Sequence, residues 1–143
     1  MKDEITVQTI VKASIAEVWE CWNKPEHITG WAFASDDWEA PAAENDLRVG
    51  GKFKTTMAAK DKSSSFDFTG TYTAIREYEL IAYDLDDGRQ VRTEFTEVPE
   101  GVRITESFKS ENQYPEEMQR SGWQAILGNF KKYVERIIHR ESS

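Results

Sequence analysis

The sequence predicts an α+β domain in which a curved antiparallel sheet of about six to seven strands wraps around one long C-terminal helix. Two observations carry this prediction. Between residues 52 and 108, apolar and polar residues alternate in short runs, which recur about every 10–12 residues, as in an antiparallel meander. After Pro115 the apolar residues recur at helical spacing instead. A sheet with one apolar face must be covered, so we expect this helix, the longest predicted element, to lie across it.

A strand and two short helices come first. Apolar or β-branched residues alternate with polar ones, as in a half-buried strand, at Ile5, Val7, Thr9 and Val11. Ser14 and Glu17 have the spacing of a capping box, so a helix should begin there. Its apolar stripe consists of Ile15, Val18, Trp19 and Trp22. Pro25 then begins a second short helix, PEHITGW, at a position where the missing N–H of proline costs little.

Alternating runs predict the strands of the meander. Polar or glycine-containing stretches, among them AKDKSSS, DDG and PEG, favour turns between these runs. One face of the sheet should carry Phe53, Thr55, Met57, Phe66, Phe68, Gly70, Tyr72, Ile81, Tyr83, Leu85, Val91, Thr93, Phe95, Val102, Ile104, Glu106 and Phe108.

The C-terminal helix has charges that suit its dipole. It begins at Pro115 with Glu116 and Glu117, and basic residues gather toward its end. Its apolar stripe consists of Met118, Trp123, Ile126, Phe130, Tyr133, Val134 and Ile137.

Charge and composition exclude several classes of function. The formal net charge is -8, which argues against binding of nucleic acid or of an anionic membrane surface. Cys21 is the one cysteine, so no internal disulfide can form. No apolar stretch has the length of a signal peptide or a membrane span. We therefore expect a cytoplasmic protein with one domain, residues 1–143, and a monomer, because no extra apolar helix is left uncovered.

Short segments in order along nearly the whole chain carry a family resemblance. They are Val18 and Trp19; Pro25, Glu26, His27 and Trp31; Ser35 to Trp38; Glu44 to Phe53; Phe66, Asp67, Phe68, Gly70 and Tyr72; Thr105 to Phe108; and Gly122 to Leu127. With these segments the chain resembles the bacterial activator of heat-shock-protein-90 ATPase-like family, within the START-like (SRPBCC) superfamily. The resemblance implies a helix-grip fold. It also implies a pocket between sheet and long helix, where superfamily members bind lipids, sterols, flavonoids, polyketides or plant hormones; some members are aromatases or cyclases.

The predicted pocket is the candidate site for a small hydrophobic ligand. Inward-facing apolar residues of the strands and the long helix should line it, with one polar group among them. Core packing is the simpler interpretation of Trp31 and of the helix aromatics, although in this fold the core face also lines the pocket. The residues predicted to contact a ligand are Trp31, Phe53, Met57, Phe68, Tyr72, Tyr83, Phe95, Glu106, Trp123 and Phe130.

Glu106 is the polar residue on this apolar face. A carboxylate buried without a partner costs several kcal/mol, so it should find a partner or become neutral. One interpretation is a structural hydrogen bond or a position at the wet end of the strand. The other is a group that orients the ligand, or a general acid, which makes Glu106 the one candidate catalytic residue.

The stretch WAFASDDWEAPAAENDLRVGGKF, residues 31–53, admits several interpretations. Asp36 and Asp37 could hold a metal, but adjacent carboxylates point to opposite sides of a strand and no His or Cys completes a set. Gly50 and Gly51 lack the spacing of a phosphate-binding loop. We expect packing at the pocket rim, a turn bonded by Ser35 and Asp36, and a bulge or tight bend at the glycines. No metal and no cofactor are predicted.

Three functions are compatible with these sequence features. The first is non-enzymatic binding of a small apolar or aromatic molecule, such as a lipid, a flavonoid or a polyketide-like compound. The second, implied by the resemblance, is a chaperone partner that stimulates a heat-shock-protein-90 ATPase. The third is an enzyme of the cyclase or aromatase type that uses Glu106.

Overall fold

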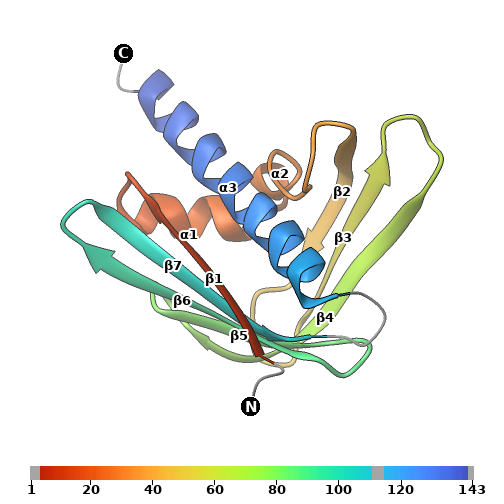
Figure 1. Cartoon of the computed structure of the whole chain (residues 1–143). Helices are drawn as coiled ribbons and strands as arrows, with labels where there is room; N and C mark the ends of the chain where they lie inside the picture. Colours follow the sequence, from red (N-terminus) through yellow and green to blue (C-terminus); the bar gives the residue numbers. More distant parts are fainter. Residues whose placement is uncertain (1–3, 111–114, 142–143) are drawn as a thin grey trace.

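The structure, a computed structural model, describes the backbone of residues 4–110 and 115–141. Within these ranges seven strands form one antiparallel sheet in the order β1-β7-β6-β5-β4-β3-β2. Helix α3 crosses the concave face of the curled sheet, and α1 and α2 lie beside it (Figure 1). The elements are β1 (Glu4–Val11), α1 (Ile15–Asn23), α2 (Pro25–Ile28), β2 (Trp38–Asn45), β3 (Lys52–Ala59), β4 (Ser65–Arg76), β5 (Leu80–Leu85), β6 (Gln90–Val98), β7 (Gly101–Lys109) and α3 (Glu116–Glu141). The predicted helix-grip architecture is confirmed.

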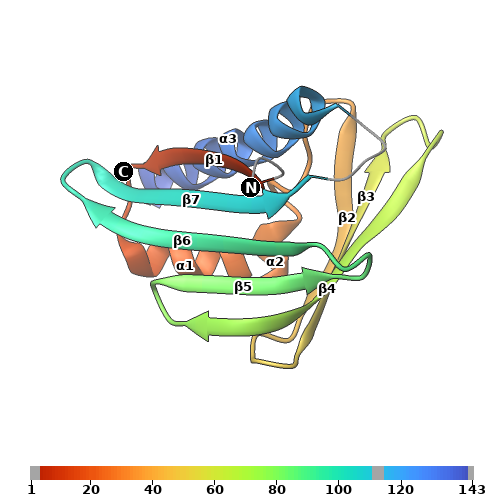
Figure 2. The same cartoon turned by 60° about the horizontal axis from the view of Figure 1, so that its bottom comes forward.

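The sheet is strongly twisted. Figure 2 shows β5, β6 and β7 lying side by side, while β2 and β3 run steeply across their direction at the other end of the sheet. The right-handed twist of neighbouring strands accumulates over the seven strands in this way. The sheet therefore forms a curved trough rather than a flat layer.

The first helices form largely as the sequence predicts. The capping box is present: the backbone N of Glu17 donates to Ser14 Oγ at 3.2 Å, and the backbone N of Ser14 donates to Glu17 Oε1 at 3.0 Å. Helix α2 is shorter than the predicted PEHITGW and ends at Ile28. Just after it, Gly30 packs closely against α3: a Cβ at Gly30 would lie 2.4 Å from Cε1 of Tyr133.

Strand β2 was not predicted as a strand. Its sequence, WEAPAAEN, contains small and acidic residues and Pro41, which strands disfavour. It lies at the edge of the sheet and pairs only with β3, with an irregular register between Glu39 and Ala42. An edge position tolerates proline because one side of the strand makes no ladder hydrogen bonds. Pairing with β3, rather than local propensity, makes this segment a strand.

Helix α3 is tied to the opposite edge of the sheet. The carbonyl oxygens of Thr6, Gln8 and Ile10 on β1 accept hydrogen bonds from α3 side chains, at 3.2, 3.1 and 2.8 Å respectively. The donors are Arg120 Nη1, Gln124 Nε2 and Lys131 Nζ. An edge strand otherwise leaves these carbonyls unpaired within the protein. The helix therefore runs along β1, and its apolar side turns into the trough.

We predict that Gly101 is required for the β6–β7 hairpin. Its φ is +145°, and a Cβ there would lie 2.1 Å from the carbonyl oxygen of Val11. Gly101→Ala should therefore lower the free energy of unfolding by about 2–3 kcal/mol. Gly122 lies in α3, where a Cβ would meet nothing within 4 Å, so Gly122→Ala should raise it by about 0.5–1 kcal/mol. Urea unfolding measures both; equal effects of the two variants would contradict the prediction.

Candidate functional site

A cavity of about 300 Å³ lies between α3 and the β3–β5 part of the sheet. Its wall is mostly aromatic and aliphatic, and the residues come from nearly every element around the trough. Among the predicted residues, Trp31, Phe53, Met57, Phe68, Tyr72, Tyr83, Glu106 and Trp123 line it. The alternation of the strands and the helical stripe of α3 therefore bring eight of the ten predicted residues to one space.

Phe95 and Phe130 lie in the core rather than on the cavity wall, and this corrects the prediction. Both are buried, with exposed fractions of 5% and 0%. Trp22 on α1 stands between them and the cavity: its ring lies 5.6 Å from that of Phe95 and 4.8 Å from that of Phe130. Trp22 itself lines the cavity. Strand and helix periodicity cannot show that a third element separates two inward-facing residues from the space they face.

Sequence reasoning did not assign the other wall residues to the site. They are Trp22, Asn23, Ile28, Ala32, Asn45, Thr55, Phe66, Ile81, Arg89, Gln119 and Ile126. Thr55, Phe66 and Ile81 each lie two positions from a chosen residue, on the same face of its strand. The two-residue period of the strands could therefore have identified them. Asn23 and Asn45 come from α1 and β2, and no local pattern brings these two elements together.

The aromatic side chains of the wall support one another. The ring of Phe53 lies 5.7 Å from Phe68, 5.3 Å from Tyr72 and 4.8 Å from Tyr83, measured between ring centroids. Phe68 contacts Trp123 edge-on at 5.9 Å. These separations and mostly tilted or edge-on geometries are those that aromatic pairs prefer. The wall is therefore held in shape by its own contacts.

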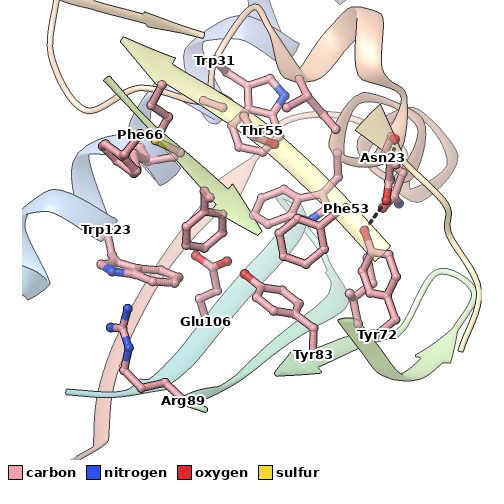
Figure 3. Close-up of a pocket in the computed structure, with 18 of the residues that line it drawn as sticks. Asn23, Trp31, Phe53, Thr55, Phe66, Tyr72, Tyr83, Arg89, Glu106 and Trp123 are labelled. Carbon is pink, nitrogen blue, oxygen red and sulfur yellow. Dashed lines mark hydrogen bonds between the residues drawn. The ribbon is translucent and has the colours of Figure 1, made fainter. Parts of the chain in front are cut away.

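A chain of polar groups closes one end of the cavity. Tyr72 donates its hydroxyl hydrogen to Asn45 Oδ1. Asn45 Nδ2 in turn donates to the carbonyl oxygen of Asn23 at 2.7 Å. These bonds join β4, β2 and α1, and Figure 3 shows the Tyr72 hydroxyl directed toward this group. Burial raises the pKa of Tyr72, so its hydroxyl remains a donor.

Glu106 faces the cavity from β7 (Figure 3). Thr93, directly opposite on β6, donates from Oγ1 to Glu106 Oε2 at 3.1 Å. Burial raises the pKa of Glu106 to about 7, and the Thr93 hydrogen bond opposes part of that rise. The structural hydrogen bond of the first interpretation is thus present, and the same carboxyl also lines the cavity.

The acidic stretch after Trp31 forms part of the rim. Residues 35–38 form the expected turn, closed by a hydrogen bond from the backbone N of Trp38 to the carbonyl oxygen of Ser35 at 3.1 Å. Ser35 Oγ donates to Asp37 Oδ1 at 2.5 Å, so the side chain that bonds in this turn is that of Asp37 and not that of Asp36. Trp38 packs against Phe66, with ring centroids 5.9 Å apart, and Phe66 is half-exposed on the cavity wall. Gly50 has φ +86°, as a tight bend between β2 and β3 requires. In the described ranges, no three His, Cys, Asp or Glu side chains gather in a way that could hold a metal ion.

His27 on α2 is half-buried. Its Nδ1 is 2.7 Å from the hydroxyl oxygen of Tyr133, and its Nε2 is 4.0 Å from Glu20 Oε2. It thus links α2 to α3 outside the cavity. The side chain of His139 lies outside the described residues. No helix in the described part of the chain is long and apolar enough to cross a membrane.

Comparison with known proteins places this fold and cavity in a family. The sequence profile of the family described as "Activator of Hsp90 ATPase homolog 1-like protein" matches residues 12–135. The chain belongs to this family, as its sequence resemblance indicates, and it has the START-like fold. No curated protein gives a significant match.

Solved structures agree with this assignment. The solution structure of an AHSA1-like protein from Aeromonas hydrophila is 41% identical, with a TM-score of 0.89, and the match covers 94% of this chain and 93% of that one. A protein from Cytophaga hutchinsonii is 50% identical, with a TM-score of 0.81 and coverage of 96% and 95%. A Chromobacterium violaceum protein, 22% identical with a TM-score of 0.83 and coverage of 94% and 99%, shares the fold.

We predict that Glu106 makes the protein less stable as the pH rises. Its pKa is about 7 in the folded protein, against an ordinary value of 4.5. Between these values the folded state binds more protons than the unfolded chain, so the free energy of unfolding falls as the pH rises through this range. Glu106→Gln does not titrate. From pH 4.5 to 8, its stability relative to the wild type should increase by about 3 kcal/mol.

Urea unfolding of both proteins at several pH values checks this difference. Glu97→Gln, a matched change at an exposed carboxyl on β6, should leave the pH dependence nearly as it is. A constant difference between Glu106→Gln and the wild type across this range would show that the carboxyl is not held neutral.

Proposed function

We propose that this protein binds a compact, largely apolar aromatic molecule in the cavity between the sheet and α3. The observation that carries the proposal is the combination of an aromatic wall with one buried carboxyl, Glu106, inside a cavity of about 300 Å³. Small-molecule sites typically pair an apolar lining with a few placed polar groups, and this volume is at the lower end of their range. It favours a compact molecule over a long-chain lipid.

The expected affinity is modest. Burying about 300 Å² of apolar ligand surface yields roughly 7 kcal/mol before losses. Lost translational and rotational freedom and ordering of side chains reduce this figure. The net binding free energy is therefore below roughly 7 kcal/mol, which corresponds to a dissociation constant of about 10 μM or weaker. We expect the protein to bind its ligand as a monomer in the cytoplasm.

An enzymatic role for Glu106 is a second candidate. A carboxyl with a pKa of about 7 can donate or accept a proton near neutral pH, as a general acid must. If the protein is a cyclase or aromatase, Glu106→Gln should abolish turnover of a bound compound while its affinity is nearly retained. Unchanged turnover in that variant would remove the residue from this role.

A chaperone partner is a third candidate, favoured by the description of the family. The net charge of -8 would steer a basic partner surface toward the protein. The measurement is the ATPase rate of the host's heat-shock-protein-90 with and without this protein, together with a pull-down. No bound chaperone and no change in rate would eliminate this function.

We predict that a bulky side chain at Thr55 blocks the cavity. Thr55 is buried on β3 and lines the cavity, so the ring in Thr55→Phe would occupy the space of a ligand. The affinity for any compound found in a panel of lipids, flavonoids and small polyketides should fall by about tenfold or more. Thr96→Phe, at an exposed position on β6, is the matched control and should bind as the wild type does.

NMR titration is the direct measurement, and the tryptophans provide reporters. Trp22, Trp31 and Trp123 line the cavity, whereas Trp19 packs against Phe95 and does not. A ligand in the cavity should shift the indole N–H signals of the first three in a saturable way and leave that of Trp19 nearly unchanged. If no compound in the panel shifts the three signals, or if Thr55→Phe binds as well as Thr96→Phe, the proposed site is wrong.

A further inference from the structure

Two groups that can donate hydrogen bonds face the same part of the cavity. Tyr83 on β5 and Glu106 on β7 lie on either side of β6, and both line the cavity. Figure 3 shows the Tyr83 hydroxyl and the Glu106 carboxyl pointing toward a common space. The two interact, because a charge on Glu106 contributes to raising the pKa of Tyr83, after the larger contribution of burial.

Each of these groups has an oxygen that the surrounding protein leaves open. The Thr93 bond to Oε2 is the one side-chain hydrogen bond of Glu106 within residues 4–110 and 115–141, and the Tyr83 hydroxyl has none there. In those ranges, every side-chain oxygen or nitrogen that is completely buried has a hydrogen-bond partner. An oxygen without a partner is therefore not completely buried. Oε1 of Glu106 and the Tyr83 hydroxyl are therefore accessible from the cavity, where a ligand can reach them.

Both open oxygens act as donors when the carboxyl is neutral. A neutral Glu106 that keeps the bond donated by Thr93 to Oε2 carries its proton on Oε1, the oxygen without a partner among the described residues. Tyr83 keeps its proton because burial raises its pKa well above the ordinary value. One carbonyl oxygen has two lone pairs and can accept from both groups. A tyrosine hydroxyl beside a carboxyl kept neutral by apolar surroundings is a proven arrangement for binding such an oxygen.

Among the remaining titratable or charged residues on the cavity wall, Tyr72 adds to the rise in the pKa of Tyr83 and Arg89 opposes it, but the contribution of burial is larger than either. Tyr72 donates to Asn45, and Arg89 holds Asp87 through Nε at 2.9 Å. The elements paired with β7 present Val7 and Thr93 opposite Glu106, and neither is charged. From α3, Gln119, Trp123 and Ile126 reach the cavity, all uncharged. Burial, opposed by the Thr93 bond, therefore dominates the protonation of Glu106.

Building on the proposed function, we infer that the cavity selects a compact, uncharged aromatic ketone or quinone whose carbonyl oxygen accepts hydrogen bonds from both the Tyr83 hydroxyl and the Glu106 carboxyl. The rings of Phe53 and Phe68, which contact the ring of Tyr83, line the same cavity and provide apolar contact for a flat conjugated skeleton. A ligand of the same shape without the carbonyl leaves both donors unpaired in an apolar space, which costs binding free energy.

Fluorenone and fluorene form a probe pair that differs in the carbonyl group. At pH 6, below the pKa of Glu106, fluorenone should bind about tenfold or more tightly than fluorene, because it pairs both donors. At pH 8.5 the ionised carboxylate offers no donor and repels the carbonyl lone pairs, so this advantage should disappear. The affinity for fluorene should change little between the two pH values. Quenching of tryptophan fluorescence measures all four dissociation constants.

Two variants separate the donors. Tyr83→Phe removes one donor and should lower the advantage of fluorenone several-fold at pH 6 without weakening fluorene. Glu106→Gln keeps an N–H donor that does not titrate, so the advantage should become the same at pH 6 and pH 8.5. A residue with only a structural role would move neither the ratio of the two affinities nor its pH dependence. Glu97→Gln is the matched control and should behave as the wild type does.

The outcomes distinguish this inference from the proposed function. Equal affinities for the two compounds at pH 6 would overturn the inference and leave the apolar binding site standing. An advantage of fluorenone that survives both pH 8.5 and Tyr83→Phe would also overturn it. Binding of neither compound would overturn the proposed function for ligands of this size, and the inference with it.

Discussion

The anchoring of α3 along β1 sets the shape of the whole trough. Side chains of the helix donate to the carbonyls of Thr6, Gln8 and Ile10, so the helix covers the exposed edge of the sheet and cannot slide toward its centre. A helix with its side chains is about 10 Å wide, whereas seven strands at about 4.8 Å spacing span roughly 30 Å. One helix held at one edge cannot cover the whole inner face.

The uncovered part of the sheet is closed by curvature and by aromatic side chains. The twist brings β2, β3 and β4 up around the helix, and α1 inserts Trp22 beside Phe130 and Phe95. These contacts bury Phe95 and Phe130 at the end of the trough near α1. Over β3–β5 the side chains meet one another around a space instead of filling it, and this space is the cavity.

Glu106 is costly at a position that an apolar residue would stabilise. A neutral carboxyl bonded to Thr93 is tolerable there, but ionisation leaves a charge with one hydrogen bond in a cavity that Trp123 and Tyr83 also line. The fold thus gives up stability as the pH rises and gains a polar group at an apolar site. Such an exchange is typical of functional positions.

Local periodicity was enough to predict most of the element types and the inward faces of the strands and of the long helix. It also identified ten candidate residues for the cavity, and eight of these line its wall. A period of two places Phe53, Met57 and Glu106 on one face wherever their strands pair. Contacts between distant segments settled what no local pattern contains. Strand β2 exists because β3 pairs with it, and Trp22 shields Phe95 and Phe130 because α1 packs across the end of the trough. Whether an inward residue meets a neighbour or a space depends on elements far apart in the chain, and only the assembled fold brings those together.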